Sequence, residues 1–381
     1  MNEVGFFTVD KINSSAIMTN GEKFVPQPER KEKEMKIDLT APIGELGSVE
    51  GWKNLPIHEC GEQLVPLGAF SDHRNIATDA IYAGERKSSP YPWGALTGSV
   101  VTIFVREGVA KRLAEAANYL PPGNMLFVWD AYRTLSVQQA LFDYFVRVLE
   151  SRGADHEKAI VDAQQFVSIP SDDPTRPPPH NTGGAVDLTI IRFHMDAWKR
   201  MQQLDKVVGQ TETEKNWREI YEAEMERQQL IRESAMPIPM GTVFDGVHPE
   251  TATRFYEDLG EPSTLSAEQN ECRENRRMLW NVMTAAGFSN YPDEWWHYDV
   301  GNQFDSARTS RPAIYGAATL SRENAEWESM RKGNHIGTVA IADGVRSSGK
   351  LPSHPILPFV EKVTTKTGNP RYTTHPPAAA I

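Results

Sequence analysis

Hydrophobic residues recur along this chain at the spacings of helices and strands. Residues 106–120 carry apolar side chains every three to four positions, which is typical of an amphipathic helix, and the Pro-Pro-Gly that follows ends it. The apolar run at 125–129 and the β-branched run at 185–191 predict strands. Helices of this kind would support a sheet that contains both strands.

Capping residues predict where further helices begin. Ser136 and Ser266 are each followed three residues later by glutamine, the signature of a capping box, and the helix after Ser266 carries an apolar stripe that ends at Gly287. Asp155 predicts the cap of a third helix that reaches about residue 167. We expect these helices to pack around the sheet.

Composition sets the two ends of the chain and one internal segment apart from the rest. Residues 1–50 are polar and charged and predict an N-terminal arm that is only partly ordered, with packed structure starting near Trp52. Residues 196–235 combine many charged side chains with apolar ones at helical intervals, which predicts an amphipathic helical pair. Residues 305–381 form a C-terminal extension, partly helical, whose last stretch is rich in Pro, Thr and Lys and predicts disorder.

Charge and cysteine content exclude several classes of protein. The 381 residues carry a net charge of −11, so a nucleic-acid-binding surface, which is normally basic, is not expected. No apolar run reaches transmembrane length and the first residues lack the regions of a secretory signal, so we expect no membrane partner and a cytoplasmic location. The two cysteines, Cys60 and Cys272, predict reduced thiols, one of them on a helix.

Four side chains in two distant motifs could form a hydrolytic zinc site. His180 and Asp187 lie in PHNTGGAVDLTI, and Glu294 and His297 lie in DEWWHYDV more than a hundred residues later. A catalytic zinc takes three nitrogen or oxygen ligands and keeps one position for water, so His180, Asp187 and His297 would hold one ion per chain. Because a proton must still pass from water to the leaving amine, Glu294 is the candidate general base and acid.

The local patterns place these residues on a loop, two strands and a bend. Prolines before His180 and a glycine pair after it predict an irregular loop, and Asp187 lies near the start of the strand that follows. WWHYDV predicts a second strand, in which His297 and Asp299 share a face and Glu294 would point the other way. Glu294 must therefore lie on a bend, which the Pro-Asp before it favours.

Both motifs resemble those of the D-alanyl-D-alanine dipeptidase family, the zinc peptidases of family M15. The family pattern SxHxxGxAxD stands here as PPHNTGGAVD at 178–187, and ExWH stands as EWWH at 294–297. Segments at 129–138 (WDAYRTLSVQ), 240–245 (MGTVFD) and 274–288 also resemble the family and keep its order. The resemblance spans roughly residues 51–304.

This resemblance implies a fold and a reaction. The fold would be α+β and hedgehog/DD-peptidase-like, with a small, mainly antiparallel sheet flanked by helices. The reaction would be hydrolysis of D-Ala-D-Ala or a related small dipeptide, with zinc held by His180, Asp187 and His297 and with Glu294 as general base. Recycling of cell-wall peptides, glycopeptide resistance and a biosynthetic step are all compatible with such an activity.

The resemblance also assigns roles to two residues and shows one departure. Arg133 matches the arginine that stabilises the tetrahedral intermediate, and Asp245 matches the aspartate associated with the substrate's free amino group. A structural ion pair for Arg133 and a turn position for Asp245 are the alternatives. Pro178 stands where the family has a substrate-contacting serine, and proline offers neither a hydroxyl nor a backbone N–H. The exact dipeptide is therefore left open.

Two other functions could use the same residues. Two histidines and one carboxylate also bind iron in non-heme oxygenases, although that chemistry does not need a glutamate three residues before the last ligand. A non-catalytic zinc-containing binding module, as in hedgehog signalling domains, would not need Glu294 either. Both alternatives rank below the dipeptidase.

The helical pair at 196–235 is longer than the link found at this place in the family and therefore resembles an insertion. We favour packing of its apolar face on the protein's own surface. A lid over the site or a contact in a homo-oligomer are the alternatives.

Overall fold

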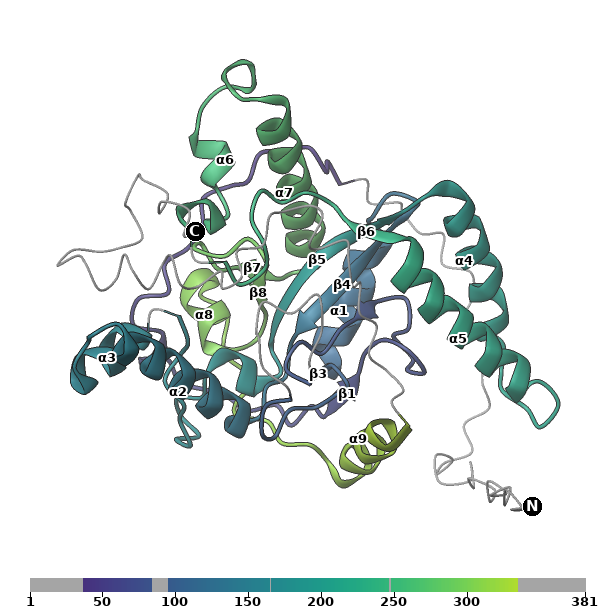
Figure 1. Ribbon diagram of the computed structural model, residues 1–381, viewed down its shortest axis with the longest axis horizontal. Helices are drawn as coiled ribbons and strands as arrows, with labels where there is room; N and C mark the ends of the chain where they lie inside the picture. The colour runs from purple at the N-terminus through teal and green to yellow at the C-terminus, as the bar shows by residue number, and fades with distance from the viewer. Residues whose placement is uncertain (1–36, 84–94, 165, 247, 335–381) are drawn as a thin grey trace. The chain divides into compact units, whose positions relative to one another are not determined.

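The computed structural model describes residues 37–83, 95–164, 166–246 and 248–334, and the structural statements below concern these residues (Figure 1). The α-helices are α1 (Glu107–Asn118), α2 (Leu135–Ser151), α3 (His156–Ala163), α4 (Met195–Val208), α5 (Trp217–Ser234), α6 (Phe255–Asp258), α7 (Ala267–Ala285), α8 (Gln303–Thr309) and α9 (Arg322–Asn334). Short 3₁₀ helices are η2 (Trp52–Asn54), η3 (Pro179–Thr182), η4 (Pro249–Thr251) and η5 (Pro262–Thr264).

The main sheet has the strand order β2 (Ala77–Thr78), β4 (Asn124–Asp130), β5 (Ala185–Phe193), β8 (His297–Asp299) and β7 (Ser289–Asn290), and β6 (Ala235–Pro237) also pairs with β5. β2 and β4 are parallel, and the other pairs are antiparallel. A separate antiparallel pair joins β1 (Leu64–Pro66) to β3 (Phe104–Arg106). The predicted α+β class with a mainly antiparallel sheet is confirmed.

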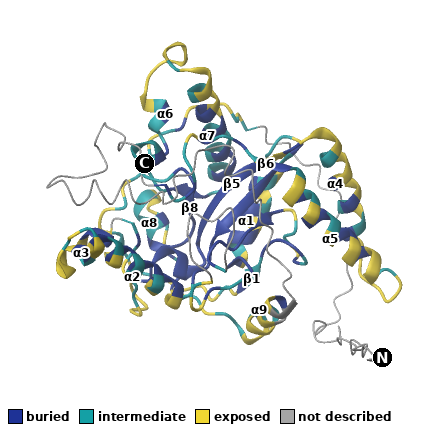
Figure 2. Ribbon diagram, in the orientation of Figure 1, coloured by how far each residue is buried: buried dark blue, intermediate teal, exposed yellow. Residues whose placement is uncertain are grey.

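Both strands predicted from the hydrophobic pattern lie in the middle of this sheet. They are β4 and β5, which pair with each other along most of their length. β5 is buried at every position except Arg192, as expected of a strand covered on both faces. Val109 of α1 and Val282 of α7 belong to the same apolar core, and Figure 2 shows the sheet buried while α3, α4 and α5 expose their outer faces. Each such buried side chain contributes about 1.5–3 kcal/mol.

Two of the three predicted helix caps are confirmed. Ser266 accepts a hydrogen bond from the Gln269 N–H at 3.1 Å, and the Gln269 side chain accepts one from the Ser266 N–H at 2.9 Å, so both bonds of the capping box are present. Asp155 accepts from the Lys158 N–H at 3.0 Å and caps α3, which ends before the predicted residue 167.

The capping box predicted at Ser136 is wrong. The N-cap of α2 is Thr134, whose backbone is extended and whose hydroxyl accepts a hydrogen bond from the Val137 N–H at 3.3 Å. Because the helix begins at Leu135, Ser136 already lies in its first turn. Threonine and serine are both good N-caps, and the sequence pattern alone favoured the wrong one of two neighbouring hydroxyls.

Packed structure begins before Trp52, earlier than predicted. Ile43 is buried, and its N–H donates to Glu257 at 3.2 Å. Arg254 donates to the carbonyl oxygen of Ile43. Residues 37–50, which the prediction placed in the polar arm, therefore include a segment that is held against α6.

The helical pair predicted at 196–235 is present as α4 and α5. Glu224 and Arg227 of α5 form a buried ion pair at 3.0 Å, with both side chains 1% exposed. Arg227 also donates to Asp205 of α4 at 2.8 Å and to the carbonyl oxygen of Arg74 at 3.0 Å. The buried face of α5 therefore packs on the protein's own surface, as the favoured interpretation predicted, whereas the apolar side chains of Trp217, Tyr221 and Met225 are exposed.

The C-terminal extension, the lack of transmembrane segments and the state of the two cysteines were also predicted from the sequence. α9 confirms helix within the C-terminal extension, whereas residues 335–381, including the predicted disordered stretch, lie outside the described residues. Within the described part, none of the helices has both the length and the apolar character that crossing a membrane requires. Cys60 is exposed, Cys272 is buried in α7, and both are free thiols, as predicted.

Candidate active site

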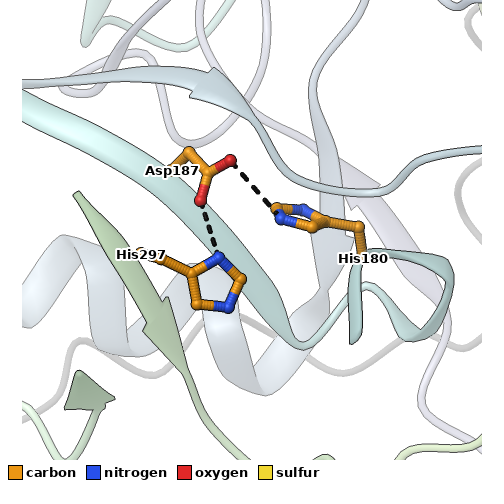
Figure 3. Close-up of side chains that lie close together, drawn as sticks. All are labelled: His180, Asp187 and His297. Atoms are coloured by element: carbon orange, nitrogen blue, oxygen red, sulfur yellow. Dashed lines mark hydrogen bonds and ion pairs between the residues drawn. The ribbon is translucent and has the colours of Figure 1, made fainter. Parts of the chain in front are cut away.

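The three predicted metal ligands meet beside the start of β5 (Figure 3). His180 lies in η3, which Gly183 ends with a φ of 70°, a conformation that glycine adopts without strain. Asp187 is in β5, and His297 begins β8 directly opposite Asp187 in the antiparallel ladder. Opposite residues of neighbouring strands point to the same face, so the register of β5 and β8 brings Asp187 and His297 together.

The distances between these side chains are close to those expected around a zinc ion. His180 Nε2 lies 3.4 Å from Asp187 Oδ2, and His297 Nδ1 lies 2.9 Å from Asp187 Oδ1. A tetrahedral zinc with bonds of about 2.0–2.2 Å separates neighbouring ligand atoms by roughly 3.3–3.6 Å. The distance between His180 and Asp187 falls in this range. The distance between His297 and Asp187 is slightly shorter than the range, because these two side chains are in direct contact. One donor atom from each of the three residues lies within 4.8 Å of the others, and all three are buried.

The outer nitrogen of each imidazole is held by the protein. His180 Nδ1 lies 2.8 Å from the carbonyl oxygen of Ala131, and His297 Nε2 lies 3.0 Å from Asp299 Oδ2. Asp299 is fully buried and also accepts hydrogen bonds from Asn302 and Arg308. Such partners fix the ring orientation and tautomer of a metal-binding histidine. They leave His180 Nε2 and His297 Nδ1 facing Asp187.

The two imidazoles differ in their affinity for protons. Burial lowers the pKa of His180 and keeps it neutral, which a metal ligand must be. Burial also acts against protonation of His297, but the carboxylates of Asp299 and Asp187 outweigh it and raise its pKa well above the ordinary value. A cation bound here would therefore displace a proton from the pair of His297 and Asp187.

Glu294 lies on the predicted bend, three residues before His297. Its N–H donates to the carbonyl oxygen of Tyr291 in a turn, and its Oε2 lies 3.9 Å from His297 Nδ1. Removal from water raises the pKa of the Glu294 carboxyl group to about 8. The positive charge of His297 opposes this shift, and the carboxylates of Asp187 and Asp245 add to it. A carboxyl group with this pKa can hold or release a proton near neutral pH, as a general acid and base must.

Arg133 follows β4 and is fixed on several sides. Its guanidinium donates to Asp130, to Gln138 Oε1 at 2.9 Å and to the Tyr82 hydroxyl at 3.1 Å. Its backbone N–H donates to the carbonyl oxygen of His180 at 3.1 Å, which ties the two segments of the site together. Arg133 therefore forms an ion pair with Asp130, which is the structural role that the sequence indicated as the alternative. It nevertheless lines the same pocket as the metal-binding residues.

Asp245 is held in a left-handed turn with a φ of 57°. This conformation is uncommon outside glycine, although aspartate is among the residues that tolerate it best. Phe244 before it stacks on Trp129 with ring centroids 4.5 Å apart, which anchors the turn in the core. Asp245 is thus a turn residue, as its alternative interpretation predicted, and it also lines the pocket that contains Glu294.

All six predicted site residues line one pocket with a cavity of about 300 Å³. This volume lies at the lower end of the range for small-molecule sites. Its walls include four aromatic residues and one lysine, namely Trp52, Phe166, Tyr291, Phe304 and Lys53. No residue of 196–235 lines the pocket in the described part of the chain, so the structure does not support a lid formed by that segment.

Sequence reasoning missed several residues that support the site. Asp299 was expected to share a face with His297, and that alternation was a signal for its contact with the imidazole. Asp130 stands three residues before Arg133 in the same motif, which also could have suggested the ion pair. Tyr82 reaches Arg133 from a segment that carries no recognisable motif, so nothing local indicated it.

The comparisons with known proteins agree with these motifs. The model of the peptidase M15 family, described as D-Ala-D-Ala dipeptidase, matches residues 222–313, a stretch that contains Asp245, Glu294 and His297. The chain is also 26% identical over 267 residues to a D-alanyl-D-alanine dipeptidase of Synechocystis sp., covering 65% of this chain and 86% of that relative. The comparisons therefore agree with the predicted resemblance to the D-alanyl-D-alanine dipeptidases of family M15, and they support a metallopeptidase, which is a hydrolase.

Proposed function

We propose that this protein is a zinc-dependent dipeptidase that hydrolyses D-Ala-D-Ala or a related small dipeptide. One observation carries this proposal: a single pocket contains three converging metal-binding side chains, with the carboxylate of Glu294 3.9 Å from one of them. The similarity to a D-alanyl-D-alanine dipeptidase supports the substrate class.

In this proposal the residues around the ion move protons. His180, Asp187 and His297 would hold one zinc ion, which would supply Lewis acidity beside the scissile carbonyl and make water more acidic. Glu294 would accept a proton from the attacking water and deliver it to the leaving amine. Because the protein raises the pKa of Glu294, this carboxyl group can keep the proton between the two steps.

Arg133 and Asp245 would orient the substrate. Arg133 would hydrogen-bond to the carbonyl oxygen as negative charge develops on it, and its fixed guanidinium would need little rearrangement to do so. Asp245 would pair with the substrate's ammonium group and so restrict the enzyme to peptides with a free N-terminus.

We also propose that residues 51–304 form the catalytic unit, with the arm 1–50, the helical insertion 196–235 and the extension 305–381 added to it. The pocket supports this division, because its lining residues other than Val49 of the arm lie between Trp52 and Phe304. The hedgehog/DD-peptidase-like topology, the cytoplasmic location and a homo-oligomer formed through the insertion stay predictions.

An assay of the zinc-loaded protein against a panel of small substrates tests the proposed function. The panel contains D-Ala-D-Ala, D-Ala-D-lactate, and L,D and L,L dipeptides. We expect release of D-alanine from D-Ala-D-Ala or cleavage of a related dipeptide, with Pro178 permitting a preference other than D-Ala-D-Ala. No hydrolysis of any member at full zinc occupancy would contradict the proposal and favour the binding module. Bound iron together with oxygen consumption would favour the oxygenase.

A further inference from the structure

Lys53 is a pocket-lining cation whose ammonium group has no ion-pair partner in the described part of the chain. The ammonium group lies over an aromatic ring, with Nζ 5.3 Å from the centroid of Trp52. Three carboxylates, those of Asp187, Asp245 and Glu294, line the same pocket. In a chain of net charge −11, a half-buried lysine without a carboxylate partner suggests that an anion arrives with the ligand.

An aromatic wall connects Lys53 with the metal-binding residues. The ring of His297 lies 6.2 Å from that of Phe304, and Phe304 makes an edge contact with Trp52 at 4.7 Å. Tyr291 adds to this wall, 5.9 Å from His297 and 5.6 Å from Phe304. A peptide bound at His297 could therefore extend along an apolar surface that ends at a positive charge.

Other groups in the pocket are less suited to bind a negatively charged end of a ligand. Arg133 also lines it, but that guanidinium is already paired with Asp130 and hydrogen-bonded to Gln138. Pro178 and Pro179 line another part of the wall and have no N–H to donate. Lys53 is thus the charged donor of the described pocket that is engaged neither in an ion pair nor in the contact proposed for Arg133 with the scissile carbonyl.

We propose that Lys53 binds the C-terminal carboxylate of the substrate, so that the pocket selects peptides whose leaving group is a free amino acid. This inference rests on the proposed function and adds the residue that recognises the leaving group. Asp245 and Lys53 would then recognise the two charged ends of a dipeptide, with the scissile bond between them. Recognition at both ends would exclude the interior of longer chains.

Steady-state kinetics of the zinc-loaded full chain with D-Ala-D-Ala and with its C-terminal amide tests this role. Lys53→Met removes the charge and keeps an apolar side chain against Trp52. We expect it to raise KM for the acid roughly 10- to 100-fold, the effect of a lost charge-assisted hydrogen bond, with little change in kcat. The kcat/KM for the amide should stay as in the wild type, and Lys53→Arg should recover most of the preference for the acid.

Lys206→Met is the matched control, because Lys206 is an exposed residue of α4 and does not line the pocket. It should leave the kinetics for both substrates unchanged. Equal losses for acid and amide in Lys53→Met, or an undiminished preference for the acid, would overturn the proposal.

A binding measurement separates this proposal from the proposed function. The probe is a D-Ala-D-Ala analogue in which CH₂–NH replaces the scissile amide, used as the free acid and as the C-terminal amide in calorimetric titrations. The wild type should bind the acid roughly 10-fold or more tightly than the amide, and Lys53→Met should bind both alike. If the wild type binds the two forms equally, or binds neither, the proposed role of Lys53 in recognising the carboxylate is wrong. Preferred binding of the acid without hydrolysis of any dipeptide contradicts the dipeptidase proposal alone.

Discussion

At the scale of single residues, the two histidines of the site present different ring nitrogens to the candidate metal position. His180 presents Nε2 because its Nδ1 is held by the carbonyl oxygen of Ala131. His297 presents Nδ1 because its Nε2 is held by Asp299. The partner on the far side of each ring thus decides which nitrogen is available.

Replacement of Asp299 should weaken metal binding although Asp299 is not one of the three candidate metal ligands. In Asp299→Asn the imidazole of His297 loses its buried carboxylate partner, so we expect the zinc dissociation constant to rise roughly 10- to 100-fold. Competition with a chromogenic chelator measures it. Asp258→Asn, at an exposed position of α6, is the control and should bind zinc as the wild type does. Unchanged zinc affinity in Asp299→Asn would show that this carboxylate does not orient His297.

Replacement of Glu294 should separate metal binding from turnover. Glu294→Gln keeps the size of the side chain but cannot carry a proton in the same way, so turnover should fall roughly 10²- to 10⁴-fold. Zinc content, measured by elemental analysis, should stay at one ion per chain because the three ligands are unchanged. Retained turnover in this variant would remove Glu294 from the mechanism.

The sequence motifs identified the candidate metal-binding and catalytic residues. They did not identify the residues that hold these side chains in place or line the pocket beside them. His180, Asp187 and His297 stood out because metal-binding side chains came together with prolines, glycines and a nearby glutamate. Lys53 and Tyr82 carry no such signal. Their place in the site depends on how distant segments pack, which local pattern does not determine.

At the scale of elements, the hydrophobic pattern located strands and helices better than it located their ends. β4, β5 and α1 match the predicted segments closely. The start of α2 was misplaced because two hydroxyl residues two positions apart could both serve as its cap. The choice between them depends on the path of the preceding chain, which leaves Thr134 extended and able to donate to the carbonyl oxygen of Gly98.

Matched substitutions in α2 test the corrected cap. Thr134→Ala removes the side chain that accepts from the Val137 N–H and should lower the free energy of unfolding by about 1 kcal/mol. Ser136→Ala, at an exposed position of the first turn, should change it by less than about 0.5 kcal/mol. Denaturant unfolding followed by circular dichroism gives both values. A larger loss for Ser136→Ala than for Thr134→Ala would restore the original prediction.

At the scale of the whole molecule, the candidate site is assembled from segments that are far apart in sequence. Its pocket is lined from η2, the loop after β4, η3, β5 and the turn before β8. The order of the motifs indicated that these segments belong to one unit. The pairing of β5 with β8, which brings two of them into contact, is a long-range register that no local pattern encodes.

Arg227 is one of the residues that fasten the helical insertion to the rest of the protein. Arg227→Met leaves Glu224 buried without its ion-pair partner, which should cost about 3–5 kcal/mol of unfolding free energy. The double variant Arg227→Met with Glu224→Gln should lose less, because no charge is left unpaired. Turnover per folded molecule should be unchanged in both, since α5 does not line the pocket. A double variant as unstable as the single one would contradict this account of the buried charge.

The most direct test of the candidate metal centre is anomalous X-ray diffraction at the zinc absorption edge, from crystals of the zinc-loaded protein. We predict one peak per chain, at about 2.0–2.2 Å from His180 Nε2, a carboxylate oxygen of Asp187 and His297 Nδ1. A peak elsewhere, or none between these three side chains, would contradict the account.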